Sequence, residues 1–183
     1  CSSSFQKREK GLNHQIKMPK IQGPEKLKSD LELRKDLQSK IPKDYLPMWL
    51  REREIETRQV EPVDLLKAEK LPPYRSTWMK PTGKLPTDER IHQALLLYVS
   101  DMGLLGAAVN PHEVNFMSKK FQSASLDHVM WFHGKVNFNN WILHHMHSPI
   151  SQNARGFSRG SIYTKSGKLI ASTAQEGLMR IWD

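Results

Sequence analysis

A long apolar segment that carries one acidic side chain constrains this chain more than any other feature. Residues 87–108 show apolar side chains at three- and four-residue spacing, which is the period of a helix. The members of this stripe are Ile91, Ala94, Leu95, Tyr98, Met102 and Leu105. Because Leu96, Leu97 and Val99 make the opposite side apolar too, we predict a helix buried in the middle of a domain. Asp101 falls inside the stripe, and a buried carboxylate is costly unless it has specific partners.

Local signals set the ends of this helix. Pro86 precedes it, and Thr87 is a favourable N-cap residue. Negative charge at Asp88 suits the first turn of a helix. At the other end the helix is expected to stop before Pro111, with Gly103 weakening its last turns.

Short apolar or alternating runs on both sides of the helix predict strands. They cover residues 54–60, 74–79, 121–133, 141–146, 155–164 and 169–180. The polar loop 165–168 contains a glycine and predicts a hairpin between the last two. One long helix with an antiparallel meander indicates an α+β fold in which a sheet wraps around the helix.

The first 44 residues differ from the rest of the chain. They are rich in Lys, Ser, Gln and Pro and hold eleven basic and six acidic side chains. Apolar residues are too sparse there for a core, so we predict a loosely organised linker with a short helix within 29–39.

Composition narrows the class of function. The net charge of +9 favours an anionic partner. No zinc-ligand spacing, RNP-like strand or compact Lys/Arg run accompanies it, so nucleic acid is not a predicted partner. The single cysteine, Cys1, excludes a disulfide within the chain. No apolar run approaches the roughly 20 residues that a membrane span needs, so none is predicted.

Three polar side chains are candidates for chemistry, and each also has an ordinary structural explanation. Asp101 could accept a proton from water, or it could only accept hydrogen bonds from nearby N–H or hydroxyl groups. Ser125 lies within a predicted strand without the glycines of a nucleophile elbow. Gln175 and Glu176 must point to opposite faces of a strand, and Gln175 could hold a water or satisfy a sheet edge.

Two further motifs are weaker. His145 and His147 would share one strand face beside His144, but no third ligand has a recognisable spacing, so no metal is predicted. No glycine-rich phosphate loop is present, and Gly156 and Gly160 are expected to relieve crowding within a strand.

Four runs of residues together resemble the acyl-CoA thioesterase II family, which includes a bacterial enzyme and the peroxisomal acyl-CoA thioesterase of eukaryotes. They are LYVSD at 97–101, SLDHVMWFH at 125–133, ARGFSRG at 154–160 and ASTAQEG at 171–177. The resemblance covers about residues 50–183 and, more weakly, residues 4–19. It implies the hotdog fold, an antiparallel sheet wrapped around one long helix, here as the second half of a tandem double hotdog.

The resemblance also implies domain limits and partners. Residues 1–19 would be the remnant of the last strand of the first hotdog, 20–49 a linker and 50–183 the C-terminal hotdog thioesterase domain. The chain would pair with another hotdog domain or homo-oligomerise. The expected compartment is the peroxisome in a eukaryote or otherwise the cytoplasm, with no targeting signal visible in the chain.

The activity implied is hydrolysis of acyl-CoA thioesters to free fatty acid and coenzyme A. The family's catalytic positions fall on Asp101, Ser125 and Gln175, which would orient a water molecule. No cofactor or metal is implied, because coenzyme A is part of the substrate. We expect an apolar slot for the acyl chain; its predicted lining is Met102, Leu105, Met130 and Phe132. The alternative is a non-catalytic acyl-CoA-binding or assembly module, because the first hotdog is missing.

Overall fold

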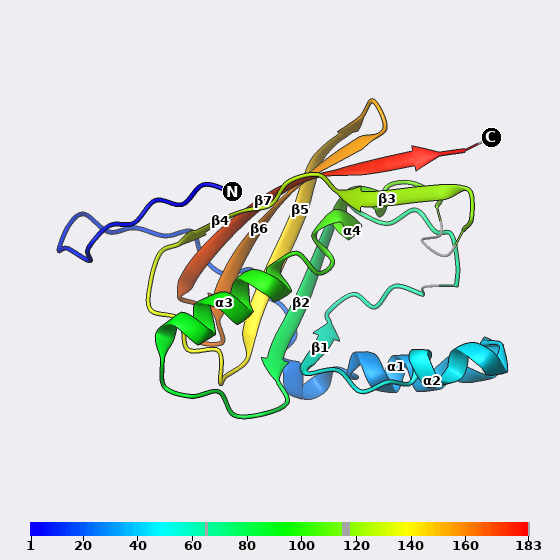
Figure 1. Cartoon of the computed structure of the whole chain (residues 1–183), viewed down its shortest axis with the longest axis horizontal. Helices are drawn as coiled ribbons and strands as arrows, with labels where there is room; N and C mark the ends of the chain where they lie inside the picture. Colours follow the sequence, from blue (N-terminus) through cyan, green and yellow to red (C-terminus); the bar gives the residue numbers. More distant parts are fainter. Residues whose placement is uncertain (65, 115–117, 183) are drawn as a thin grey trace.

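The computed structural model describes residues 1–64, 66–114 and 118–182, and within them it is an α+β structure (Figure 1). The helices are η1 (Pro24–Lys26), α1 (Asp30–Asp36), η2 (Gln38–Lys40), η3 (Lys43–Tyr45), α2 (Leu46–Trp49), α3 (Glu89–Ser100) and α4 (Leu104–Val109). The strands are β1 (Ile55–Gln59), β2 (Tyr74–Pro81), β3 (Phe121–Ser125), β4 (Val129–Phe132), β5 (Ile142–Gln152), β6 (Arg155–Thr164) and β7 (Leu169–Ile181). The predicted strands are therefore present, although 121–133 is divided into two.

One antiparallel sheet holds all seven strands, in the order β1-β2-β5-β6-β7-β3, and β4 also pairs with β7. β3 and β4 lie one after the other along β7, with β3 opposite its C-terminal part. Helices α3 and α4 cross one face of the sheet (Figure 1), and α4 packs on β5, β6 and β7. This arrangement confirms the predicted class, in which a sheet wraps around a helical segment.

Tight turns join the last three strands. Gly167 adopts φ 87° in the predicted 165–168 hairpin, a backbone conformation that suits glycine. A second hairpin, not predicted, turns through Asn153 and Ala154, whose φ values are 52° and 55°. Positive φ at two successive turn residues is typical of the hairpin turns that match strand twist.

The main core lies between the sheet and α3. Leu96 and Val99 of α3 are fully buried there, and the other buried members are Ile55, Met79, Val136, Phe138, Ile142, Ile162, Ile170 and Ala171. His92 is also buried, and its Nδ1 accepts a hydrogen bond from Phe138 N–H. The helix thus has a distinct inner face.

The predicted buried stripe of the helix is wrong. Ile91, Tyr98 and Met102 are exposed, at 43%, 65% and 42% of their surface. Because both sides of this helix are apolar, periodicity alone could not say which of them faces the sheet. The structure turns Leu96 and Val99 inward and leaves much of the predicted stripe uncovered.

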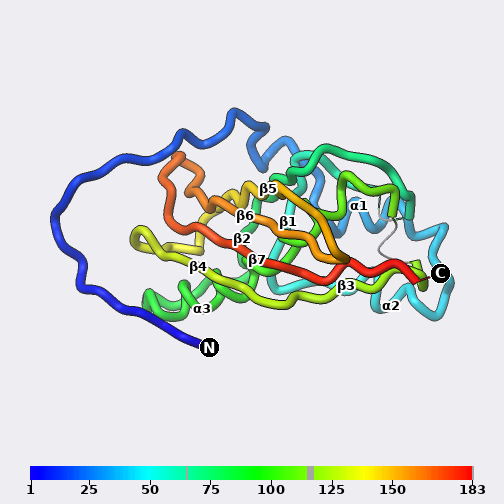
Figure 2. The backbone as a smooth tube through the Cα atoms, turned by 90° about the horizontal axis from the view of Figure 1, so that it is seen from above, coloured from blue at the N-terminus to red at the C-terminus, as the bar shows by residue number. Residues whose placement is uncertain are grey.

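The N-terminal segment is better organised than predicted. Its predicted short helix is α1, and Ser29 and Glu32 form a capping box at its start. Before it, residues up to 23 run without helix or strand around the sheet to the face opposite α3 (Figure 2). There Met18, Ile21 and Leu27 pack against a second cluster, made of Trp78, Leu143 and Tyr163. The segment therefore covers the outer face of the sheet, while its boundaries at 19 and 49 stay predictions.

Residues Glu89–Val109 are the one stretch in the described chain that is long and apolar enough to cross a membrane. Helices of soluble cores meet the same criterion, and this one packs on the sheet and is interrupted after Ser100. The absence of a membrane span stays a prediction.

Gly160 of β6 tests the packing of this interior. A Cβ atom there would lie 2.8 Å from His144 Cδ2 and would also overlap Thr173 Oγ1. We expect Gly160→Ala to lower the free energy of unfolding by about 1–3 kcal/mol, measured by urea denaturation. Gly134→Ala is the matched control, because its Cβ would meet Lys168 Cε at an ordinary 3.6 Å. Equal stability of the two variants would contradict this account of Gly160.

Candidate functional site

Asp101 lies at a break in the helical segment rather than inside a continuous buried helix. α3 ends at Ser100, and α4 begins after Gly103, whose φ of 81° is readily adopted only by glycine. The prediction of one helix over 87–108 with a buried Asp101 is therefore wrong, and Asp101 is exposed. Asp101 thus lies between the C-terminal end of α3 and the N-terminal end of α4, and hydrogen-bond donors are needed to fix the direction of its exposed carboxylate.

Two strands supply those donors, and all three predicted site residues come together. Ser125 Oγ, at the end of β3, donates to Asp101 Oδ1 over 3.1 Å. Gln175 Nε2, on β7, donates to the same oxygen. Within the described residues Asp101 Oδ2 has no hydrogen-bond partner, so it can accept a hydrogen bond from a water molecule or a ligand.

Gln175 and Glu176 point to opposite faces of β7, as alternation along a strand requires. Its side chain is buried, at 1% exposure, whereas Glu176 lies on the opposite face and pairs with Arg155 over 3.2 Å. Gln175 Oε1 is buried and has no partner among the described groups. The bond from Nε2 to Asp101 is thus the contact that orients this amide.

A β-bulge directly follows Ser125, at residues 126–128, and the sequence prediction of one strand over 121–133 missed it. Ser125 pairs with Gly177 and Val129 pairs with Ala174, so three residues lie opposite two. Leu126 N–H and Asp127 N–H both point to Glu176 O, at 2.9 and 3.4 Å. Asp127, a residue that disfavours strands, was the available signal.

The bulge also brings His128 to the end of α3. Its Nε2 lies 2.8 Å from Ser100 Oγ, and Ser100 is fully buried. Burial lowers the pKa of His128, and the carboxylates of Asp101 and Asp127 oppose that shift. His128 was not among the predicted site residues.

An open pocket of about 350 Å³ adjoins the three predicted residues. It is lined by Leu97, Tyr98, Asp101, Ser125, Leu126, Asp127 and His128. A volume above about 300 Å³ is in the range of small-molecule sites. The apolar lining consists of Leu97, Tyr98 and Leu126, not of the four residues predicted for the acyl slot.

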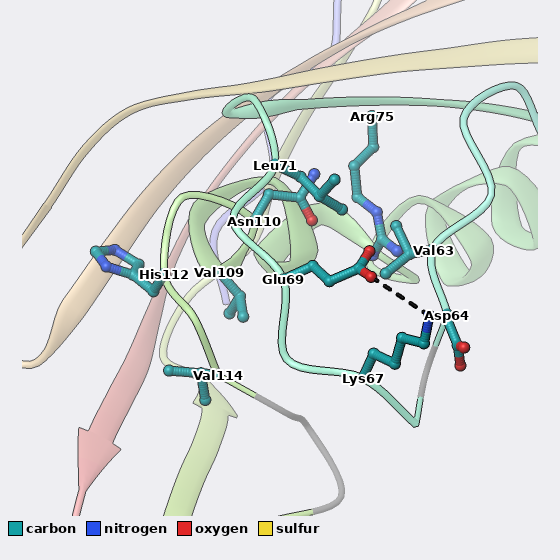
Figure 3. A pocket seen from close by; sticks show the side chains of 10 residues that line it. All are labelled: Val63, Asp64, Lys67, Glu69, Leu71, Arg75, Val109, Asn110, His112 and Val114. Carbon is teal, nitrogen blue, oxygen red and sulfur yellow. Dashed lines mark ion pairs between the residues drawn. The ribbon is translucent and has the colours of Figure 1, made fainter.

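A second cavity lies at the C-terminal end of α4 (Figure 3) and holds only about 30 Å³. Burial lowers the pKa of Arg75 there, and its guanidinium reaches Gln59 Oε1 at 3.5 Å. An ion pair between Lys67 and Glu69 lies at its rim. This space accommodates about one water molecule and is too small for a coenzyme A ester.

The three histidines of β5 do not gather. His144 is fully buried and contacts Thr173 Oγ1 at 3.2 Å, whereas His145 contacts Ser76 Oγ at 3.0 Å and His147 is exposed. Among the described residues no group of three His, Cys, Asp or Glu side chains could hold a metal ion. The crowding predicted at Gly156 and Gly160 is present, since a Cβ at either would overlap a neighbouring side chain.

Comparison with known proteins gives the family. A family model described as acyl-CoA thioesterase matches residues 49–178. The chain belongs to the acyl-CoA thioesterase family. Acyl-CoA thioesterase 2 of Haemophilus influenzae is 35% identical over 179 residues, 98% of this chain and 63% of that protein. Human acyl-coenzyme A thioesterase 8 is 31% identical over 189 residues, 99% of this chain and 59% of that protein.

Solved structures agree with the fold. The acyl-CoA thioesterase II structure from Mycobacterium marinum matches with a TM-score of 0.70 and 28% identity, over 96% of this chain and 60% of that one. A hotdog-fold protein from Alicyclobacillus acidocaldarius matches with a TM-score of 0.65 and 15% identity, over 97% and 60%. The predicted hotdog fold is confirmed, and the chain spans about three fifths of the length of these relatives.

The burial of His144 predicts that the free energy of unfolding depends on pH. Burial lowers its pKa to about 3, against 6.5 for an ordinary histidine. Between these values the unfolded chain binds more protons than the folded one, so the free energy of unfolding falls as the pH is lowered from 6.5. The expected slope is at most about 1.4 kcal/mol per pH unit.

Urea denaturation between pH 7 and pH 5 measures this slope. His144→Gln removes the titrating group and is expected to flatten the dependence on pH. Met146→Leu, a buried neighbour on the same strand, controls for altered packing and should keep the wild-type slope. A slope that is unchanged in His144→Gln would contradict the assignment.

Proposed function

We propose that the protein hydrolyses acyl-CoA thioesters to free fatty acid and coenzyme A. The observation that carries the proposal is the convergence of two donors, Ser125 Oγ of β3 and Gln175 Nε2 of β7, on one carboxylate oxygen of Asp101, which directly follows α3. Because Asp101 Oδ1 accepts both donors, Oδ2 remains for a water molecule beside the open pocket. The family relatives, which are named acyl-CoA thioesterases, support the same reaction.

The proposed chemistry starts with that water. Asp101 Oδ2 accepts one of its protons as the water oxygen attacks the thioester carbonyl carbon. The carbon–sulfur bond then breaks, its electron pair goes to sulfur, and the coenzyme A thiolate takes the proton that Asp101 accepted, which restores the carboxylate. Ser125 and Gln175 fix the direction of the carboxylate, which is an orientation effect. No metal or cofactor has a part in this scheme.

Substrate binding is proposed for the pocket beside Asp101. Leu97, Tyr98 and Leu126 offer an apolar surface to the acyl chain next to the carboxylate. Coenzyme A is a polyanion, and the net charge of +9 attracts it over long range. An acyl-CoA ester therefore matches both the pocket lining and the overall charge.

A role in lipid metabolism would follow from this reaction. We propose a peroxisomal location in a eukaryote and a cytoplasmic one in a bacterium. A yeast protein named peroxisomal acyl-coenzyme A thioester hydrolase 1 is 34% identical over 91 residues. This similarity supports the peroxisomal alternative.

Exposed apolar side chains at one edge of the sheet favour a second proposal, that another hotdog unit covers this edge. They are Leu97, Tyr98 and Met102 near the end of α3, Leu126 of the bulge, and Val129, Trp131 and Phe132 of the edge strand β4, each at least 40% exposed. Exposed surfaces of this kind are typical of interaction sites. If the chain lacked hydrolytic activity, the same surface would serve a binding or assembly module.

The proposed chemistry predicts the effects of substitutions in the intact protein. Asp101→Asn is expected to lower kcat at least about 100-fold, because the amide cannot accept the proton of the water. Ser125→Ala and Gln175→Ala should lower it about 10- to 100-fold by loosening Asp101. Release of free thiol from a fatty acyl-CoA is the measurement, and a chelator should leave the rate unchanged.

Glu176→Gln is the matched control, since Glu176 is adjacent to Gln175 but lies on the opposite face of the strand. It should keep the wild-type rate. Wild-type hydrolysis by Asp101→Asn would refute the proposed site. Binding of acyl-CoA without any thiol release by the wild-type protein would favour the non-catalytic module.

Thiol labelling tests whether another hotdog unit covers these exposed apolar side chains. Trp131 and Tyr45 are similarly exposed in this chain, at 51% and 58%. With the natural cysteines of the intact protein replaced, we expect the thiol of Trp131→Cys to react at least about tenfold more slowly than that of Tyr45→Cys, because a second hotdog unit shields it. Equal labelling rates would argue that the surface is free.

A further inference from the structure

Two adjacent residues, Ser100 at the end of α3 and Asp101 directly after it, each form a hydrogen bond across to the segment that contains the bulge. Ser125 Oγ donates to Asp101 Oδ1 over 3.1 Å, and Ser100 Oγ lies 2.8 Å from His128 Nε2. In a regular strand, residues three apart point to opposite faces. The bulge between β3 and β4 is therefore what lets Ser125 and His128 both reach the same helix end.

The direction of the second bond follows from the last turn of α3. The Asp101 N–H is directed to Val99 O, so it does not satisfy the carbonyl of Leu97. Ser100 Oγ does so instead, over 2.8 Å, and a hydroxyl has one hydrogen to donate. Ser100 Oγ also lies 3.9 Å from Met130 Sδ, a longer contact than the one to Leu97 O. We therefore assign the hydrogen of the short contact to His128 Nε2, with the buried Ser100 Oγ as its acceptor.

Leu126 and Asp127, the other residues of the bulge, form their hydrogen bonds with β7. Glu176 N–H donates to Asp127 Oδ1 over 2.8 Å, and Glu176 O accepts from Leu126 N–H. The Ser100–His128 bond thus joins the bulge to the helix at a partly buried position, whereas Ser125 and Asp101 are both exposed. A bond that is partly shielded from water is electrostatically stronger than an exposed one.

We propose that His128 is a positioning residue, which through Ser100 keeps Ser125 within hydrogen-bonding distance of Asp101. This inference rests on the proposed function, because it assigns His128 to the same site. His128 lines the pocket, but the role assigned to it acts through Ser100 and Ser125 and not on the water or the ester. Its loss would let the bulge shift relative to α3, and displacement of a catalytic group by about 1 Å can cost about 100-fold in rate.

A pair of amide variants tests the proposal in the intact protein. The Nε2 of Gln lies about as far from its backbone as the Nε2 of His, whereas the amide of Asn is shorter and cannot reach Ser100. We expect His128→Asn to lower kcat 10- to 100-fold with KM within twofold of wild type. His128→Gln should restore kcat to within about fivefold of wild type.

Ser100→Ala removes the acceptor and leaves His128 in place, so it should lower kcat as His128→Asn does. The double variant should be no worse than either single one, because both break the same bond. His133→Asn is the matched control: His133 Nε2 makes an equally short 2.8 Å contact with Ser172 Oγ, but at an exposed position. It should keep the wild-type kcat.

Several results would overturn the proposal. They are a wild-type kcat in Ser100→Ala, equal losses in His128→Gln and His128→Asn, and multiplicative losses in the double variant. Failure of the proposed function is distinguishable, because Asp101→Asn would then hydrolyse acyl-CoA at the wild-type rate. A crystal structure of Ser100→Ala gives a readout besides activity: the Ser125 Oγ–Asp101 Oδ1 separation should exceed 3.5 Å, and an unchanged 3.1 Å would reject the positioning role.

Discussion

The site depends on a carboxylate that lies in the break between two helices and is oriented by donors from two strands. Asp101 follows the last turn of α3 and precedes the N-cap of α4 by two residues. The donors that orient it, Ser125 and Gln175, both come from strands far away in the sequence. The sheet, the bulge and the helix break must therefore all be correct before this carboxylate is held in one direction. The geometry of the site therefore depends on the correct fold of the whole domain.

The sequence predicted which residues lie together at the site better than it predicted the local geometry of the backbone there. The composition of the strands and their turns indicated an α+β fold, and the sheet formed as expected. The motif resemblance named Asp101, Ser125 and Gln175, which the structure brings together. Their roles stay predictions until the variants are measured.

What the sequence did not predict depends on small differences of conformation. Gly103 was seen as a weak point of a helix, but its positive φ ends α3 and exposes Asp101. The bulge adds one residue opposite β7, a change that alternation cannot show when Leu126 and Met130 keep a regular pattern around it. The predicted buried face of α3 was wrong because apolar residues lie on both sides of this helix. Which side is buried then depends on what packs against it, and the sheet packs against Leu96 and Val99.

The two faces of the fold are covered unequally, and this bears on how a polyanionic substrate is bound. The N-terminal segment packs on the outer face of the sheet, where Lys165 pairs with Glu25, and on the rim Arg155 pairs with Glu176. Lys165 and Arg155 are thus held in ion pairs, and the positive net charge of +9 provides a long-range attraction for a polyanion. The pocket itself carries the carboxylates of Asp101 and Asp127 beside apolar side chains. In the proposed reaction a neutral ester enters this pocket and a fatty acid carboxylate forms next to Asp101. Repulsion between these like charges favours release of the product, so the same carboxylate that activates the water also limits product inhibition.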